Sequence, residues 1–122
     1  MAKSTYLKNK ILDAIFNSTA YSVAADVYIS LHTADPGITG ANEVTGGTYT
    51  RQQVPFNAAA SGSTKNTSSI SFTLMPTATV THIGIYDALA GNFLEGAALS
   101  TSISVTVGNT LTITAEHIIA AF

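Results

Sequence analysis

The side chains best suited to chemistry in this chain are its three histidines, His32, His82 and His117. A hydrolytic triad needs a serine or threonine nucleophile, a histidine base and a carboxylate brought together. The chain has 30 serines and threonines, so a hydroxyl near some histidine is expected without any function. It contains no Gly-x-Ser-x-Gly nucleophile elbow. The sequence therefore predicts no catalytic residues and no enzymatic activity.

Two of the histidines have an aspartate close by in the sequence, and each pair offers ligands for a metal ion. His32 is followed by Asp35, and His82 by Asp87. Neither spacing matches a known ligand motif, and the acidic residues are too dispersed for a calcium loop. We expect Asp87 to hold a turn by accepting a backbone N–H. The prediction is that no metal is bound, with a His82–Asp87 site as the alternative.

The sequence also predicts no cofactor site, because no glycine-rich loop opens a helix to cradle a phosphate. The five tyrosines could form a platform for a sugar, or could serve the core and the interfaces of a small β-protein. They are Tyr6, Tyr21, Tyr28, Tyr49 and Tyr86. We favour the second interpretation, because aromatic residues are common in strands.

The first element that we expect is an amphipathic helix over residues 4–17, with Ser4 as its N-cap. Leu7, Ile11 and Ile15 recur every four residues and predict a buried apolar face. A helix of about 12 residues is marginal alone. It should therefore dock, either on its own β-domain or on a neighbouring subunit.

The rest of the chain reads as short strands separated by turn signals. The expected strands are 26–33, 49–56, 69–74, 80–86, 92–99, 102–107 and 110–118. Gly108-Asn109 predicts a two-residue hairpin between the last two strands. About seven such strands predict an all-β fold over residues 26–119: an antiparallel β-sandwich, in which a jelly-roll arrangement is one option. The whole chain is expected to be one domain.

Alternation within these strands predicts which side chains enter the core. Residues 27–32 alternate apolar and polar side chains, as a half-buried strand does. Ile83 and Ile85 should point into the core, and Gly84 between them suggests close approach of another backbone or of an aromatic ring. Two stretches, 37–48 and 57–68, lack a hydrophobic period and are expected to be loops that contact neighbouring subunits.

Charge and composition limit the possible partners. Only 10% of the residues are charged and the formal net charge is −2, so nothing favours nucleic acid. No apolar run reaches the ~20 residues that span a bilayer, and no membrane contact is expected. Cysteine is absent, which excludes disulfides. A surface so poor in charge indicates that neighbouring subunits cover part of it, and we expect a homo-oligomer, with a trimer favoured.

Several motifs, in order along the chain, resemble those of small virion proteins from tailed bacteriophages. These proteins are often labelled tail-fibre-like, and some of them coat the capsid. The matching stretches are 6–13, 27–36, 47–51, 60–66 and 81–94. Within the last stretch, Ala90 stands where the family often has Gly, and Phe93 replaces a Leu. The resemblance implies a structural role on a phage particle that is assembled in the bacterial cytoplasm.

We therefore expect a non-enzymatic virion structural protein that works by packing. The leading hypothesis is a decoration or cement protein bound to the major capsid protein on the head exterior. The alternative is a protein of the tail tip or tail fibre, bound to other tail proteins and able to bind the host surface.

Overall fold

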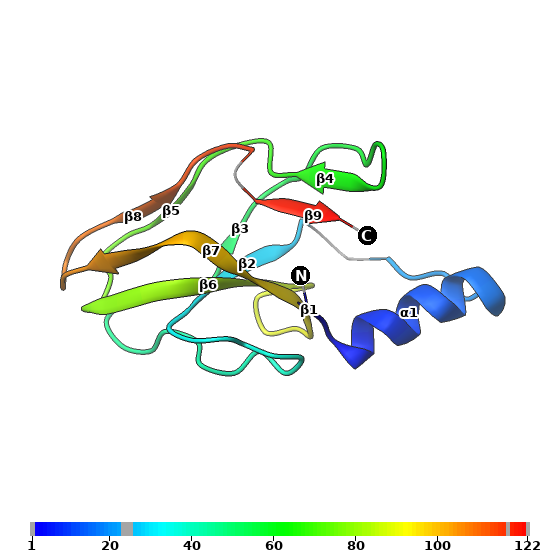
Figure 1. Cartoon of the computed structure of the whole chain (residues 1–122), viewed down its shortest axis with the longest axis horizontal. Coiled ribbons are helices and arrows are strands. Elements are labelled where there is room, and N and C mark those ends of the chain that lie inside the picture. The colour runs from blue at the N-terminus through cyan, green and yellow to red at the C-terminus, as the bar shows by residue number, and fades with distance from the viewer. Residues whose placement is uncertain (1, 23–25, 117, 122) are drawn as a thin grey trace.

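The chain folds into a β-rich body from which one helix projects (Figure 1). This computed structural model describes residues 2–22, 26–116 and 118–121, so His117 lies outside the described residues. The elements in these ranges are β1 (Ala2–Lys3), α1 (Thr5–Phe16), β2 (Tyr28–His32), β3 (Gln52–Gln53), β4 (Ser63–Lys65), β5 (Ile70–Phe72), β6 (Ala78–Tyr86), β7 (Phe93–Val105), β8 (Leu111–Ile113) and β9 (Ile119–Ala121). All strand pairs are antiparallel. The predicted sandwich class with an N-terminal helix is confirmed.

Helix α1 begins and ends where the sequence predicts. Ser4 Oγ accepts a hydrogen bond from the Leu7 N–H at 3.1 Å and caps the first turn. The predicted burial of the apolar face is only partly correct, because Leu7 and Ile11 are half-buried but Ile15 is 68% exposed. The helix starts beside β7 and then extends away from the body (Figure 1), and its last residues Ile15 and Phe16 are exposed. No helix in the described ranges is long and apolar enough to cross a membrane.

Five strands form the main sheet, in the order β1-β7-β6-β2-β3. The predicted hairpin of β6 and β7 is confirmed, with Ile83 opposite Ala97 and Ile85 opposite Glu95. Ile83 and Ile85 are both buried in the hydrophobic core, as predicted. The residues that build this core come from both layers of the sandwich: Ile29, Leu31, Val44, Val54, Ile70, Phe72, Met75, Val80, Ile83, Ile85, Leu94, Val105, Leu111, Ile113 and Ile118.

The main sheet is covered on both faces, which corrects the half-buried strand predicted for residues 27–32. Ile29 and Leu31 are fully buried on the core face, but Ser30 and His32 on the opposite face are fully buried as well. The covering segment is 33–47. It includes most of the stretch 37–48, which was predicted to be a loop that contacts neighbouring subunits.

Contacts along this covering segment are tight. Pro36 lies so near the sheet that a methyl group on Gly96 would come within 2.5 Å of Pro36 Cγ. The Val44 N–H donates to the Leu31 carbonyl at 2.9 Å, and Val44 is buried. Residues 37–48 form a loop, as predicted, but part of the loop packs on its own sheet, because Val44 is buried there; other positions, such as Ile38 at 53%, are exposed. Contact of this loop with neighbouring subunits stays a prediction.

The second layer is built on β5 and β8, which pair with each other. The predicted Gly108-Asn109 hairpin is wrong, because β7 pairs with β6 and β8 with β5. The turn at 106–109 instead carries the chain from one layer to the other. It is held by Met75, whose N–H donates to the Asn109 carbonyl at 2.9 Å and whose carbonyl accepts from the Gly108 N–H at 2.9 Å.

The two strands predicted over 92–99 and 102–107 are one strand, β7, interrupted by a bulge. Val80 pairs with Ile103, while His82 pairs with Ala98, so Thr81 alone stands opposite the four residues 99–102. A bulge of this kind leaves residues without ladder partners and bends the strand. The polar run Ser100-Thr101-Ser102 breaks the strand pattern at this place, and that break caused the wrong division.

The second predicted loop, 57–68, also contains structure. Its residues 63–65 form β4, which pairs with β9. Asn66 is fully buried: its Nδ2 donates to the Ser68 and Thr114 carbonyls, and its Oδ1 accepts from the Ile118 N–H at 2.9 Å. These bonds tie the loop to the last described residues. The strand predicted over 110–118 is too long, because β8 ends at Ile113 and β9 begins only at Ile119.

Candidate functional site

The structure brings one serine and one histidine together, but it buries them. Ser30 Oγ lies 2.7 Å from His32 Nε2, and His32 Nδ1 lies 2.8 Å from the Ala41 carbonyl oxygen. A carbonyl only accepts, so Nδ1 carries the proton and Nε2 accepts the Ser30 hydroxyl. Burial lowers the pKa of His32 below its ordinary value of 6.5. Both residues are 0% exposed, so no substrate reaches this pair without opening the fold.

Gly84 explains how the Ser30–His32 pair fits against the sheet. A methyl group at Gly84 would lie 2.5 Å from Ser30 Oγ, 2.7 Å from His32 Nε2 and 3.0 Å from the Phe93 ring. The close approach predicted from this glycine is confirmed, and the aromatic ring over it is Phe93. The glycine thus makes room for a polar pair in a packed layer.

The predicted His–Asp pairs are occupied with other bonds. Asp35 Oδ1 accepts the Gly37 N–H at 2.8 Å, and His82 Nδ1 lies 2.8 Å from Thr81 Oγ1. Asp87 Oδ1 accepts the Asn92 N–H at 2.7 Å, which is the turn role predicted for it. In the described ranges, no three His, Asp or Glu side chains gather into a set that could hold a metal ion.

The best-connected polar group is one that the sequence analysis missed, the ion pair of Glu43 and Arg51. Arg51 Nη2 donates to Glu43 Oε1 at 2.8 Å, and Arg51 Nε donates to Glu43 Oε2 at 3.0 Å. Tyr49 Oη also donates to Glu43 Oε2, at 2.8 Å, and accepts the Leu31 N–H at 2.9 Å. The Arg51 guanidinium lies 3.4 Å from the centre of the Tyr86 ring, a cation–π contact.

This network joins the covering segment to the sheet, and its polar groups are engaged with one another. Burial alone would raise the pKa of Glu43, but the hydrogen bonds from Arg51 and Tyr49 outweigh it and hold that pKa below the usual range. Burial and the Glu43 carboxylate raise the pKa of Tyr49 well above that of a free phenol. Each carboxylate oxygen of Glu43 already has a donor. The sequence feature that could have indicated this ion pair is Glu43 itself, because it is the only charged residue in the glycine- and threonine-rich stretch 37–48.

The tyrosines do not gather into one platform. Tyr49 stacks on Phe72 in the core, and Tyr86 packs edge-on against Phe93. Tyr6 and Tyr21 meet edge-on beside α1, with Lys10 Nζ over both rings at 5.4 and 5.9 Å. These positions agree with the core and packing role that we favoured over a sugar platform.

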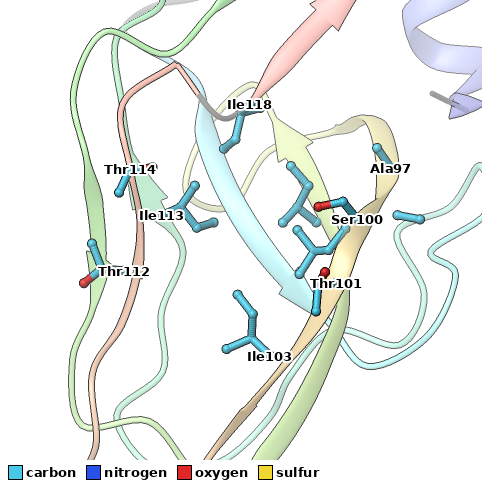
Figure 2. A pocket seen from close by; sticks show the side chains of 11 residues that line it. Ala97, Ser100, Thr101, Ile103, Thr112, Ile113, Thr114 and Ile118 are labelled. Atoms are coloured by element: carbon cyan, nitrogen blue, oxygen red, sulfur yellow. The ribbon is translucent and has the colours of Figure 1, made fainter.

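A groove lies between the two layers of the sandwich, where β7 runs beside β8. It has a volume of about 550 Å³, within the ~300–1,000 Å³ of ligand sites. Figure 2 shows Ile113 and Ile118 on one side, with Ile103, Ser100 and Thr101 on the other. The residues that line this β7–β8 groove are mostly apolar: Ile83, Ala97, Ala98, Leu99, Ser100, Thr101, Ile103, Thr112, Ile113, Thr114 and Ile118.

The β7 bulge creates this groove. Residues 99–101 of the bulge are among its lining, and they lie where β7 has lost its pairing with β6. The sheets stay apart on this side because β7 and β8 pair with other strands. The polar run at 100–102 marks the place of the irregularity in the sequence, but it does not distinguish a bulge from the strand break that we predicted.

The exposed side of α1 is the second candidate surface. Leu12, Ile15 and Phe16 are 51%, 68% and 75% exposed. Spacings of three and four residues place them on one face of the helix. No residue of α1 is fully buried, although the helix carries enough apolar residues to form a docking stripe.

Comparison with protein families accounts for almost the whole chain. The family described as podophage GP4 fiber I protein gp80 matches residues 2–121, a range that includes both α1 and the groove. No curated protein matches the chain. The matched range contains every motif on which the resemblance to tail-fibre-like virion proteins rests. The chain therefore belongs to the podophage GP4 fiber I protein gp80 family, and is a bacteriophage fibre-type structural protein of the virion.

Proposed function

We propose that this protein is a non-enzymatic structural module of a phage tail fibre or tail tip, and that it works by packing against copies of itself and against other tail proteins. The observation that carries the proposal is that one chain has both an exposed apolar helix face and a mostly apolar groove. Only 10% of its residues are charged. Such surfaces mark protein–protein contacts.

The absence of enzymatic activity is supported by the state of the polar side chains. The Ser30–His32 pair is fully buried, and the Glu43 carboxylate is saturated by Arg51 and Tyr49. A general base must come within hydrogen-bond reach of the proton that it removes from a substrate. Neither His32 nor Glu43 is placed to do so.

Location in the tail is favoured by the word fiber in the description of the matching family. Capsid decoration is the second candidate, because the chain is a short module without heptads or a fibrous repeat. Under either role we expect a homo-oligomer, with a trimer favoured. Partners are the tail proteins or the major capsid protein, and neither nucleic acid nor membrane is a partner of a chain with a net charge of −2.

Quantitative mass spectrometry of purified particles, together with antibody labelling in electron micrographs, tests the location. A tail component should be present in few copies, with label on the tail. A copy number comparable with that of the major capsid protein, with label over the head, would replace the tail proposal with capsid decoration. Absence of the protein from particles would overturn both.

A further inference from the structure

The exposed face of α1 has a defined composition, and we name it the arm face. It consists of Lys8, Leu12, Ile15 and Phe16, which follow one another at helical spacings. Lys8 is exposed at the N-terminal end of the face, and the three apolar side chains occupy the rest. The arm face therefore combines one cation with an apolar stripe.

The base of the helix is held firmly, so the arm face has a fixed direction. β1 pairs with β7 at Glu95 and Gly96, and the Ser4 N–H donates to the Leu94 carbonyl at 2.7 Å. Lys3 Nζ lies 3.4 Å from Glu95 Oε2 in an ion pair that is mostly buried. A helix held at one end presents its free end with little loss of entropy on binding.

The arm face cannot fill the groove of its own chain. Figure 1 shows α1 leaving the body at one end, while β5 and β8 lie at the opposite end. Since Ser4 is bonded to Leu94, the helix would have to break its cap and β1 to turn back. An arm face and a groove on one rigid chain can meet only between different copies.

Charge favours the same contact. Residues 1–17 carry three lysines and one aspartate, whereas the remaining residues carry two basic and six acidic side chains. The arm is thus positive and the body negative. Glu116 follows the groove residue Thr114 and precedes the groove residue Ile118 in the sequence. Its side chain is 60% exposed and lies 3.8 Å from Lys65 Nζ of its own chain, a long and solvent-exposed ion pair. Lys8, at one end of the apolar stripe, is suited to compete with Lys65 for this carboxylate.

We propose that the arm face of one copy docks in the β7–β8 groove of a second copy, with Lys8 beside Glu116 of that copy. This proposal deepens the homo-oligomer proposed above and rests on it. Arm and groove are different surfaces, so the contact is heterologous; such a contact forms a ring where its rotation closes and an open filament where it does not. A ring of three is the trimer favoured above. A single 12-residue helix buries less than the ~800 Å² per partner of a stable interface, so each contact is weak and closure supplies avidity.

Complementation between two variants tests the arm–groove contact. The arm variant is Ile15→Ser with Phe16→Ser, and Ala14→Ser is its control on another side of the helix. The groove variant is Thr101→Trp, which fills the groove from an exposed position on the bulge, and Thr101→Ser is its control. Thermal melts verify that each variant is folded, and sedimentation measures association.

We expect the wild-type chain and both controls to associate, and each variant alone to remain monomeric. An equal mixture of the two variants at about 1 mM, where a contact of about −4 kcal/mol is half-formed, should form a dimer that grows no further, because one intact arm meets one intact groove. This dimer should be weaker than the wild-type assembly, because no ring closes. Loss of association in only one of the two variants, or no dimer in the mixture, would overturn the proposal. A wild-type chain that stays monomeric at about 1 mM, a concentration that corresponds to a binding free energy of about −4 kcal/mol, would also overturn the proposal.

Cross-linking locates the contact independently, since the chain contains no cysteine. Phe16→Cys in one preparation and Thr101→Cys in another should form a disulfide-linked dimer when mixed and oxidised. The pair Phe16→Cys with Thr79→Cys, away from the groove, is the control and should not cross-link. Equal yields of the mixed disulfide-linked dimer in the two mixtures would contradict arm docking. The fibre role is tested separately, by the copy number in particles and the position of the antibody label.

Discussion

Two regions of this molecule differ in which kind of side chain they bury and which kind they leave exposed. In and under the covering segment 33–47, polar groups are satisfied: the buried Ser30 bonds His32, and the half-buried Glu43 of the segment bonds Arg51. Along the arm face, apolar side chains are exposed to solvent, and the β7–β8 groove leaves a hollow of about 550 Å³ between the layers, although its Ile83, Ile113 and Ile118 are themselves buried. Buried polar groups contribute to a unique fold only when they are satisfied. Exposed apolar groups contribute to stability only when a partner covers them. The covered region thus serves folding, and the open region is suited to assembly.

The largest expected loss lies in the core beneath the covered sheet. Ile85→Ala should lower the free energy of unfolding by about 2–5 kcal/mol, because it removes buried methyl groups and leaves a cavity. Ile85 is 5% exposed. Val107→Ala is the control, since Val107 is 75% exposed. Urea unfolding measures both changes, and similar losses for the two variants would show that this strand is not a core strand.

The second-largest loss of stability is expected from the Glu43–Arg51 ion pair, which holds the covering segment on the sheet. Glu43→Gln should cost about 1.5–3 kcal/mol, because one acceptor oxygen is replaced by a donor that faces the Arg51 guanidinium. Both side chains are 19% exposed, so solvent screens the pair only partly. Lys65 and Glu116, a more exposed pair at 3.8 Å, supply the control Lys65→Met, which should cost below about 1 kcal/mol. Equal costs would mean that the covering segment does not depend on Glu43.

Gly84→Ala should cost about 1–3 kcal/mol through overpacking. The added methyl group would meet Ser30 Oγ and His32 Nε2 at distances well below van der Waals contact. Gly108→Ala is an instructive comparison, because a methyl group there has open space but sits at φ 87°. Its cost would come from backbone strain alone. Chemical denaturation of the double variant Gly84→Ala with Ser30→Ala should recover part of the loss, and no recovery would contradict the proposed clash.

The pH dependence of stability should also trace to the covered region. The pKa of His32 is below 6.5 in the folded chain because burial disfavours the imidazolium, despite the Ala41 carbonyl and the Glu43 charge. The unfolded state therefore binds more protons below pH 6.5, and stability present above that pH is lost as the pH falls through the folded pKa. A second loss, from Glu43, follows at lower pH, because its folded pKa is also depressed. NMR titration of His32 checks the direction, and a pKa above 6.5 would contradict it.

The contrast between the regions also explains what could be predicted from the sequence. Local signals were sufficient for α1, with its Ser4 cap, and for the β6–β7 hairpin, with its Asp87 turn. They failed where a distant segment decided the outcome. Whether Ser30 and His32 are exposed depends on residues 33–47 folding back over them, and whether Ile15 is buried depends on where the helix points. The β7 bulge likewise depends on register with β6, which no local pattern around residues 99–102 specifies.

The smallest expected effect distinguishes the open region from the covered one. Ile15→Ser should change the stability of the monomer by less than about 0.5 kcal/mol, because Ile15 is 68% exposed. The two residue types have similar helix propensities. Ile11→Ser is the matched change on the same helix, and it should cost more because Ile11 is half-buried. Thermal melts at micromolar concentration compare the two variants. An equal or larger loss for Ile15→Ser would mean that the end of α1 is packed within its own chain, and the open region would then contribute to folding as the covered one does.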